Sequence, residues 1–277
     1  LAGSACLRGG RMGTPSVRNV LLIETLLLSL IFGWFYCGQL VWAAWLTDAN
    51  TVYWSNGMPI LLALTAGVAW RCRGLGRFHR PVTVGALLML ALGYLLLPLM
   101  RPVIHPLQLS ASSQWKGRVC MQSTSSSCAP AAAATLLAEK GLVSKADATG
   151  MEARLAGLCL SSNQGTVALG LYRGLAMEAT RGGYQAQVAD TNPRLWIGQQ
   201  QLPNVALVRF EARDDDSRFR QFIGRSDRGH AVCVLGRTDG GRWLIGDPAI
   251  GVITWSDEEF DKRFLGDAIY LASSGNN

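Results

Sequence analysis

Hydrophobic residues are distributed unevenly along the chain, and their pattern changes near residue 105. Before that point there are three long apolar runs, at about 17–45, 52–70 and 81–100. Each run is close to or above the roughly 20 residues that an α-helix needs to cross a bilayer. Residues 1–16, which are rich in Gly, Ser and Arg, precede them. The pattern predicts a disordered segment over 1–16 and a membrane region over 17–105 with about three transmembrane helices.

A polar linker at 108–116 follows, and the predicted second domain, residues 110–277, consists of shorter segments. Three predicted helices come first, at 128–140, 147–160 and 167–179, because these ranges show helical spacing or strong helix formers. Thr166 is the expected N-terminal cap of the third. Runs typical of strands follow at 184–188, 204–210, 231–235, 243–245, 251–254 and 268–271. The turn at 238–241 predicts a hairpin, and Ser256 with Glu259 predicts a capping box. Helices followed by strands, without βαβ alternation, predict an α+β domain.

The composition of the chain supports a membrane region, and the positions of the arginines predict its orientation in the membrane. Hydrophobic residues make up 49% of the chain and charged residues only 16%, against roughly 25% in ordinary soluble domains. The net charge is +7, but the basic residues gather beside the apolar runs, which favours a lipid bilayer as partner and argues against nucleic acid. The arginines in question are Arg8, Arg11, Arg18, Arg71, Arg73, Arg77 and Arg80.

Cytoplasmic loops carry an excess of Lys and Arg, so both of these basic flanks are expected inside the cell. The loop 46–51 has Asp48 and no basic residue. Three crossings then place the C-terminal domain in the periplasm or extracellular space, as an integral protein of a bacterial inner membrane. If the second run does not cross, the domain is cytoplasmic.

Cys128 is the first candidate for chemistry. It stands directly before Ala129-Pro130 and a run of helix formers, and proline suits the first turn of a helix. The helix N-terminus carries partial positive charge, which favours a thiolate nucleophile. Gln122 lies six residues upstream, in a loop of small hydroxyl residues, and its amide is placed to donate a hydrogen bond to an oxyanion. The alternative is a buried structural cysteine.

His230 and Asp247 supply the remaining candidates. His230 is the only histidine of the C-terminal domain and begins a predicted strand, and Asp247 ends the next one. A hairpin folded at 238–241 brings the end of the second strand back towards the start of the first. The carboxylate would then orient one imidazole nitrogen while the other faces a thiol, as a nucleophile–base–acid triad requires.

The order of these motifs resembles peptidase family C39, which is papain-like and includes the peptidases that process bacteriocin leaders after a double glycine. The similarity extends over residues 114–272 and rests on Gln122-x5-Cys128, Gly165-Thr166, Gly229-His230 and Gly246-Asp247-Pro248. It implies a nucleophile at Cys128, a base at His230, an orienting acid at Asp247 and an oxyanion hole at Gln122, with no metal or organic cofactor.

Two departures from that family stand out. Ser127 occupies a position where the family usually has Asp, and Ala129 one where it usually has Gly. The chain has no Gly-x4-Gly-Lys-[Ser/Thr] phosphate loop, so we do not expect it to act as an ABC exporter. We therefore expect a stand-alone, membrane-anchored form of the peptidase.

The sequence as a whole predicts a membrane-anchored cysteine endopeptidase that cleaves an exported or membrane-delivered protein or leader peptide. The resemblance implies a cleavage site that contains glycine. A peptide-binding module with a peptidase-like fold, and a cell-wall amidase, remain as alternatives. Cys120, Cys159 and Cys233 are candidates for a disulfide if the domain lies outside the cell, and nothing in the sequence chooses a pair.

Overall fold

The structure is a computed structural model, and it describes residues 15–72, 76–144, 147–209 and 229–275. The chain divides into two compact units. One contains the three long helices, and the other contains Leu40–Thr51 together with the described residues from Arg101 onward. Residues 1–14, most of the predicted disordered segment, lie outside the described residues, whereas residues 15 and 16 begin the first helix.

The helical unit contains α2 (Pro15–Phe35), α5 (Met58–Arg71) and most of α6 (His79–Ile104), with the short α4 (Thr51–Trp54) before α5. Three segments are long and apolar enough to cross a membrane: Val17–Phe35, Thr51–Arg71 and His79–Ile104. Met58, Leu62 and Ala66 of α5 pack in a core with Leu87 and Ala91 of α6. Most other apolar side chains of α2 and α6 are exposed, as expected for helices that face lipid.

The first apolar run is not one continuous helix, so the predicted span 17–45 is too long. Helix α2 ends at Phe35, and Gly38 takes a left-handed conformation (φ +73°) that a residue with a side chain rarely adopts. The chain then forms the separate helix α3 (Val41–Trp45), which belongs to the other unit. At the third run the helix is longer than predicted and continues through Pro98 to Ile104.

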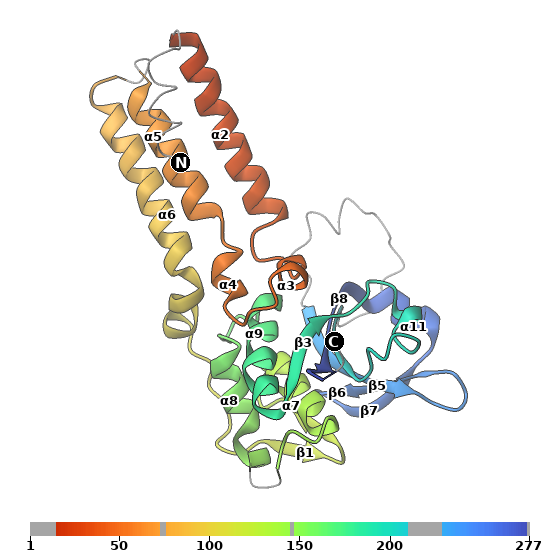
Figure 1. Ribbon diagram of the computed structural model, residues 1–277. Coiled ribbons are helices and arrows are strands. Elements are labelled where there is room, and N and C mark those ends of the chain that lie inside the picture. The colour runs from red at the N-terminus through yellow and green to blue at the C-terminus, as the bar shows by residue number, and fades with distance from the viewer. Residues whose placement is uncertain (1–14, 73–75, 145–146, 210–228, 276–277) are drawn as a thin grey trace. The chain divides into compact units, whose positions relative to one another are not determined.

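The second unit is built on a six-stranded antiparallel sheet in the order β3-β8-β4-β5-β6-β7. Its strands are β3 (Tyr184–Val188), β4 (Asn204–Arg209), β5 (Gly229–Arg237), β6 (Trp243–Asp247), β7 (Gly251–Trp255) and β8 (Phe264–Ser273). The helices α7 (Cys128–Glu139), α8 (Met151–Leu158) and α9 (Ala168–Ala179) precede it in sequence and lie grouped beside it (Figure 1). The predicted α+β class is confirmed.

Local details differ from the sequence-based expectations in three places. A two-stranded hairpin, β1 (Gln114–Lys116) and β2 (Val119–Met121), begins inside the predicted linker 108–116. The helix predicted at 147–160 is shorter, because its first turn is the 3-10 helix η1 (Asp147–Gly150). Thr166 does not cap α9, since its hydroxyl is 2.7 Å from the Ser161 hydroxyl.

The cap predicted at Ser256 is present on α11 (Asp257–Arg263), where the Ser256 side chain accepts a hydrogen bond from the Glu259 N–H.

Helix α7 is the centre of the helical layer. Every residue from Ala129 to Leu137 is buried, and the helix contacts α8, α9, β2 and β5. A helix that is buried on all sides needs small side chains so that its neighbours can approach closely, and the run Ala131–Ala134 provides them. The alanines therefore serve packing as well as helix propensity.

One core cluster of the sheet is rich in aromatic residues. Alternate residues of the central strands, such as Val232, Val234 and Ile245, pack against it. The aromatic members are Trp196, Trp243, Trp255 and Phe260. Trp243 and Phe260 stack with ring centroids 4.8 Å apart, and Trp196 meets Phe260 edge to face at 5.7 Å. Such pairs add to the stabilisation from apolar burial, and this cluster anchors the β5–β6 hairpin.

Two glycines, Gly157 of α8 and Gly170 of α9, test how tightly the helices of this layer pack. A Cβ at Gly170 would lie 2.3 Å from the backbone carbonyl oxygen of Cys159, whereas a Cβ at Gly157 meets nothing within 4 Å. We expect Gly170→Ala to destabilise the protein by about 1–3 kcal/mol, because the backbone must shift. Gly157→Ala should be neutral or stabilising by roughly 0.5–1 kcal/mol. Denaturant unfolding of the detergent-solubilised chain, followed by tryptophan fluorescence, measures both; equal effects would contradict this account.

Candidate active site

Cys128 is the first residue of α7, as the sequence predicted. The residue before it, Ser127, makes no side-chain cap at this helix end. The first N–H groups of a helix have no intrahelical partner, and their partial positive charge favours an anion close to them. The Cys128 side chain is only partly buried, so a reactant has access to it.

His230 and Asp247 meet across the β5–β6 hairpin. The register pairs Cys233 with Gly246, so Asp247 falls one diagonal step from His230. His230 Nε2 lies 2.9 Å from Asp247 Oδ1, and the two residues are only 7% and 3% exposed. Asp247 Oδ1 also accepts a hydrogen bond from the Ala249 N–H at 2.8 Å. The carboxylate is therefore held in place while it orients the ring.

His230 also forms a hydrogen bond with the Cys128 side chain. Burial by itself lowers the pKa of His230, but the hydrogen bonds to Asp247 and Cys128 and their negative charges outweigh it, and raise the pKa to about 9. The imidazolium is thus the favoured form at neutral pH. The geometry brings together a thiol, an imidazole that favours its protonated form and a carboxylate that orients it, which is the set of groups that a sulfur nucleophile needs.

Gln122 lies on the loop before α7, and a hydrogen bond to the residue after Asp247 holds its backbone. Its N–H donates to the carbonyl of Pro248, the residue after Asp247, at 2.9 Å. Its side-chain amide oxygen is buried and has no hydrogen-bond partner among the described residues. This oxygen is an acceptor and cannot stabilise an oxyanion, so the group that could donate to one is the NH2 of the same amide.

The rest of this loop, residues 122–127, is fixed by its own side chains and by α8. The Ser127 hydroxyl accepts from the Thr124 N–H and donates to the Thr124 carbonyl, both at 3.0 Å. Ser127, the residue before Cys128, is fully buried, so it closes the loop and does not face a substrate.

One residue near the loop was not singled out from the sequence. Glu152 of α8 accepts hydrogen bonds from the N–H and the hydroxyl of Ser123, at 2.8 and 3.0 Å. In the sequence it reads as an ordinary acid in the first turn of a helix, where negative charge is favourable in any case. No local signal distinguishes it.

Three other cysteines of this unit bear on the predicted disulfide. Cys120, Cys159 and Cys233 are buried free thiols, so the disulfide considered among them is not present. Burial raises the pKa of Cys120 and of Cys159 to about 12, which makes them poor nucleophiles. Within the described ranges, no group of three or more His, Cys, Asp and Glu side chains is arranged to hold a metal ion.

Comparisons with known proteins give structural matches only. No protein-family model matches the sequence, and no curated protein matches it. The peptidase domain of Streptococcus mutans ComA is 22% identical, with 56% of this chain and 98% of that domain covered and a TM-score of 0.38. The peptidase domain of Streptococcus ComA, a bifunctional ABC transporter of a quorum-sensing pathway, is 24% identical, with 55% and 95% covered and a TM-score of 0.40.

A third solved structure is a double glycine motif protease from an AMS/PCAT transporter in complex with the leader peptide. It is 21% identical to this chain, with 59% of this chain and 94% of that chain covered and a TM-score of 0.39. All three similar structures are thus peptidase domains or proteases.

The raised pKa of His230 gives a pH-dependent prediction. Because the pKa is about 9 in the folded chain against 6.5 ordinarily, the stabilisation from His230 is complete below about pH 6.5 and is lost as pH rises through about 9. Asp247→Asn removes the carboxylate charge and should lower the His230 pKa. NMR titration of the isotope-labelled histidine ring measures both values; an unchanged pKa in the variant would show that Asp247 does not hold the imidazolium.

Proposed function

We propose that this chain is a membrane-anchored cysteine endopeptidase. The observation that carries the proposal is the arrangement of Cys128, His230 and Asp247, in which a thiol at a helix start contacts an imidazole that a buried carboxylate orients. A buried structural cysteine, such as Cys233, needs no such partners. The triad arrangement serves nucleophilic acyl transfer on unrelated folds, so it is recognised by geometry and roles.

In the first half of the reaction the Cys128 thiolate attacks the carbonyl carbon of a peptide bond. The carbonyl electron pair moves to oxygen, and the amide of Gln122 with the N–H of Cys128 stabilises that oxyanion. His230 then gives its proton to the leaving amine as the C–N bond breaks. The product of this half is a thioester between Cys128 and the acyl part of the substrate.

In the second half, His230 is neutral and acts as a base. It takes a proton from water, which attacks the thioester carbonyl through a second oxyanion held by the same groups. Collapse of that intermediate breaks the C–S bond and expels the Cys128 thiolate. His230 keeps the proton that it took from water, so the thiolate and the imidazolium are both restored. Asp247 keeps its charge throughout and holds the ring in the orientation that both proton transfers need.

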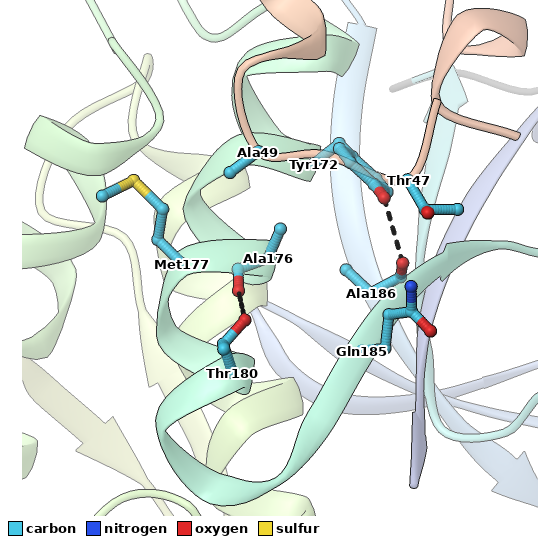
Figure 2. Close-up of a pocket in the computed structure, with 8 residues that line it drawn as sticks. All are labelled: Thr47, Ala49, Tyr172, Ala176, Met177, Thr180, Gln185 and Ala186. Carbon is cyan, nitrogen blue, oxygen red and sulfur yellow. Dashed lines mark hydrogen bonds between the residues drawn. The ribbon is translucent and has the colours of Figure 1, made fainter. Parts of the chain in front are cut away.

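The three apolar segments anchor this chemistry to a bilayer. Leu40–Thr51 follows the first segment, yet it belongs to the same compact unit as the residues from Arg101 onward. Leu40 and Ala43 are fully buried in that unit. Thr47 and Ala49 line a pocket with Tyr172 and Ala186, whose hydroxyl and carbonyl are bonded at 3.1 Å (Figure 2).

Segments that pack together lie on the same side of a membrane. The chain therefore crosses the bilayer an even number of times between Thr51 and Arg101, so Thr51–Arg71 and His79–Ile104 either both cross or neither does. Because both are long and apolar enough to span a bilayer, we propose that both cross. With the arginine-rich flanks in the cytoplasm, the catalytic unit faces the periplasm or the outside of the cell. An enzyme anchored there meets exported or membrane-delivered proteins at a raised effective concentration.

Replacement of the nucleophile tests the function. N-terminal peptide profiling of envelope and secreted proteins would compare cells with the wild-type chain, with Cys128→Ala and with the control Cys37→Ala, which removes a thiol from the helical unit. We expect new N-termini in the wild type and in the control, and none with Cys128→Ala. The residues before each cut would show whether glycine is required.

Identical profiles from the three strains, with all proteins folded and present in the membrane, would count against proteolysis. Binding of the same exported peptides by wild type and Cys128→Ala would then favour a peptide-binding module. Release of cell-wall peptide by the wild type alone would favour an amidase.

The topology has its own test, in a Cys128→Ala background with three single exposed cysteines. A membrane-impermeant maleimide added to intact cells should label Asp48→Cys in the loop after α3 and Asp239→Cys in the β5–β6 turn. Arg77→Cys, in the basic loop between α5 and α6, should react only after the cells are opened. Labelling of positions 48 and 239 from opposite sides would refute the packing argument.

A further inference from the structure

Glu152 is a buried carboxylate that the proposed mechanism does not use. It is 1% exposed and lies at the second residue of α8. Its own N–H donates to the Ser113 hydroxyl at 3.1 Å. Its Oε1 accepts from both the N–H and the hydroxyl of Ser123, and its Oε2 is buried with no hydrogen-bond partner among the described residues. Burying a carboxylate in this way is costly for stability, so the group calls for another explanation.

Ser123 is the residue directly after Gln122. Two hydrogen bonds to one oxygen fix both the backbone and the side chain of Ser123, and with them the peptide plane from which Gln122 extends. On its other side Gln122 is held through its N–H by Pro248. Further along the loop, the Ser126 hydroxyl donates to the Asn163 carbonyl at 2.6 Å. Glu152 is thus the contact through which α8 fixes the backbone directly after Gln122.

We propose that Glu152 is a positioning residue for the oxyanion hole, acting through Ser123 to hold Gln122 where the oxyanion forms. This inference rests on the proposed peptidase function. Donors for an oxyanion must be preorganised, because their contribution depends on facing the developing charge without rearrangement. A displacement of about 1 Å in such a group is enough to cost roughly 100-fold in rate.

The proposed role depends on the length of the Glu152 side chain more than on its negative charge. Two substitutions separate the effect of length from the effect of charge. Glu152→Asp keeps the charge but withdraws the carboxylate by one methylene, so both bonds to Ser123 are lost. Glu152→Gln keeps the length and an oxygen acceptor but removes the charge. We expect Glu152→Asp to lose roughly 10–100-fold in kcat with KM changed less than threefold, and Glu152→Gln to stay within about threefold of wild type.

The measurement uses the full chain in detergent and a fluorogenic peptide that spans a cut found only with the wild type in the N-terminal profile. A second readout is the rate at which iodoacetamide alkylates Cys128, followed by mass spectrometry. Alkylation needs the thiolate but no oxyanion hole, so Glu152→Asp should leave its rate within about twofold of wild type. Glu178→Asp is the matched control, because Glu178 is also a buried acid, bonded to Arg154 and Arg181.

A double-mutant comparison tests the route of the effect. If Glu152 acts through Gln122, adding Glu152→Asp to Gln122→Ala should lower kcat by less than about threefold further. Multiplicative losses, the reverse ranking of the Asp and Gln variants, or a parallel loss of alkylation would overturn the proposal. A wild-type chain that gives no Cys128-dependent cut would refute the peptidase function itself, which is a different outcome.

Discussion

The hydrogen bond from the Gln122 N–H to the Pro248 carbonyl joins the two parts on which the candidate site depends. Gln122 begins the loop that leads into α7, and Pro248 follows Asp247 at the end of β6. The helical layer and the sheet are therefore in register at the point where Cys128 must meet His230. The direct packing of α7 on β5 holds the helical layer against the sheet, and this hydrogen bond fixes the loop before Cys128 to the end of the strand that carries Asp247.

The buried polar groups at the candidate site fall into two classes, those with hydrogen-bond partners and those without. His230 and Asp247 are buried as a bonded pair, the condition under which buried charge is tolerated. The amide oxygen of Gln122 and one oxygen of Glu152 are buried without partners among the described residues. Local rules of polar satisfaction are broken beside the candidate site, which is where proteins accept a loss of stability for function.

The surrounding packing explains how that loss is tolerated. Helix α7 is enclosed from Ala129 to Leu137, and the aromatic cluster around Phe260 fixes the β5–β6 hairpin from one face of the sheet. Both elements that carry the triad are thus among the most constrained parts of the unit, and the sheet and helix ends place the side chains. The segment Leu40–Thr51 adds a further constraint, since it follows the first long helix along the chain yet belongs to the unit that carries the candidate site.

The sequence alone determined whatever depends on local pattern. Apolar run length predicted three candidate membrane segments, period-two runs predicted the strands, and the turn at 238–241 predicted the hairpin that sets His230 beside Asp247. Helix formers after Cys128 predicted its place at a helix start. These features follow from interactions between residues that are close along the chain, or related by one tight turn.

Only the tertiary structure decided the features that depend on distant contacts. The break after Phe35 and the assignment of α3 to the second unit reflect packing that hydropathy does not record. The free thiols of Cys120, Cys159 and Cys233 follow from where each side chain is buried. Glu152 was invisible in the sequence because its partner, Ser123, lies 29 residues away and its burial is set by the fold. Contacts between residues far apart in the chain produce no local periodicity, so they cannot be predicted from the pattern of a single sequence.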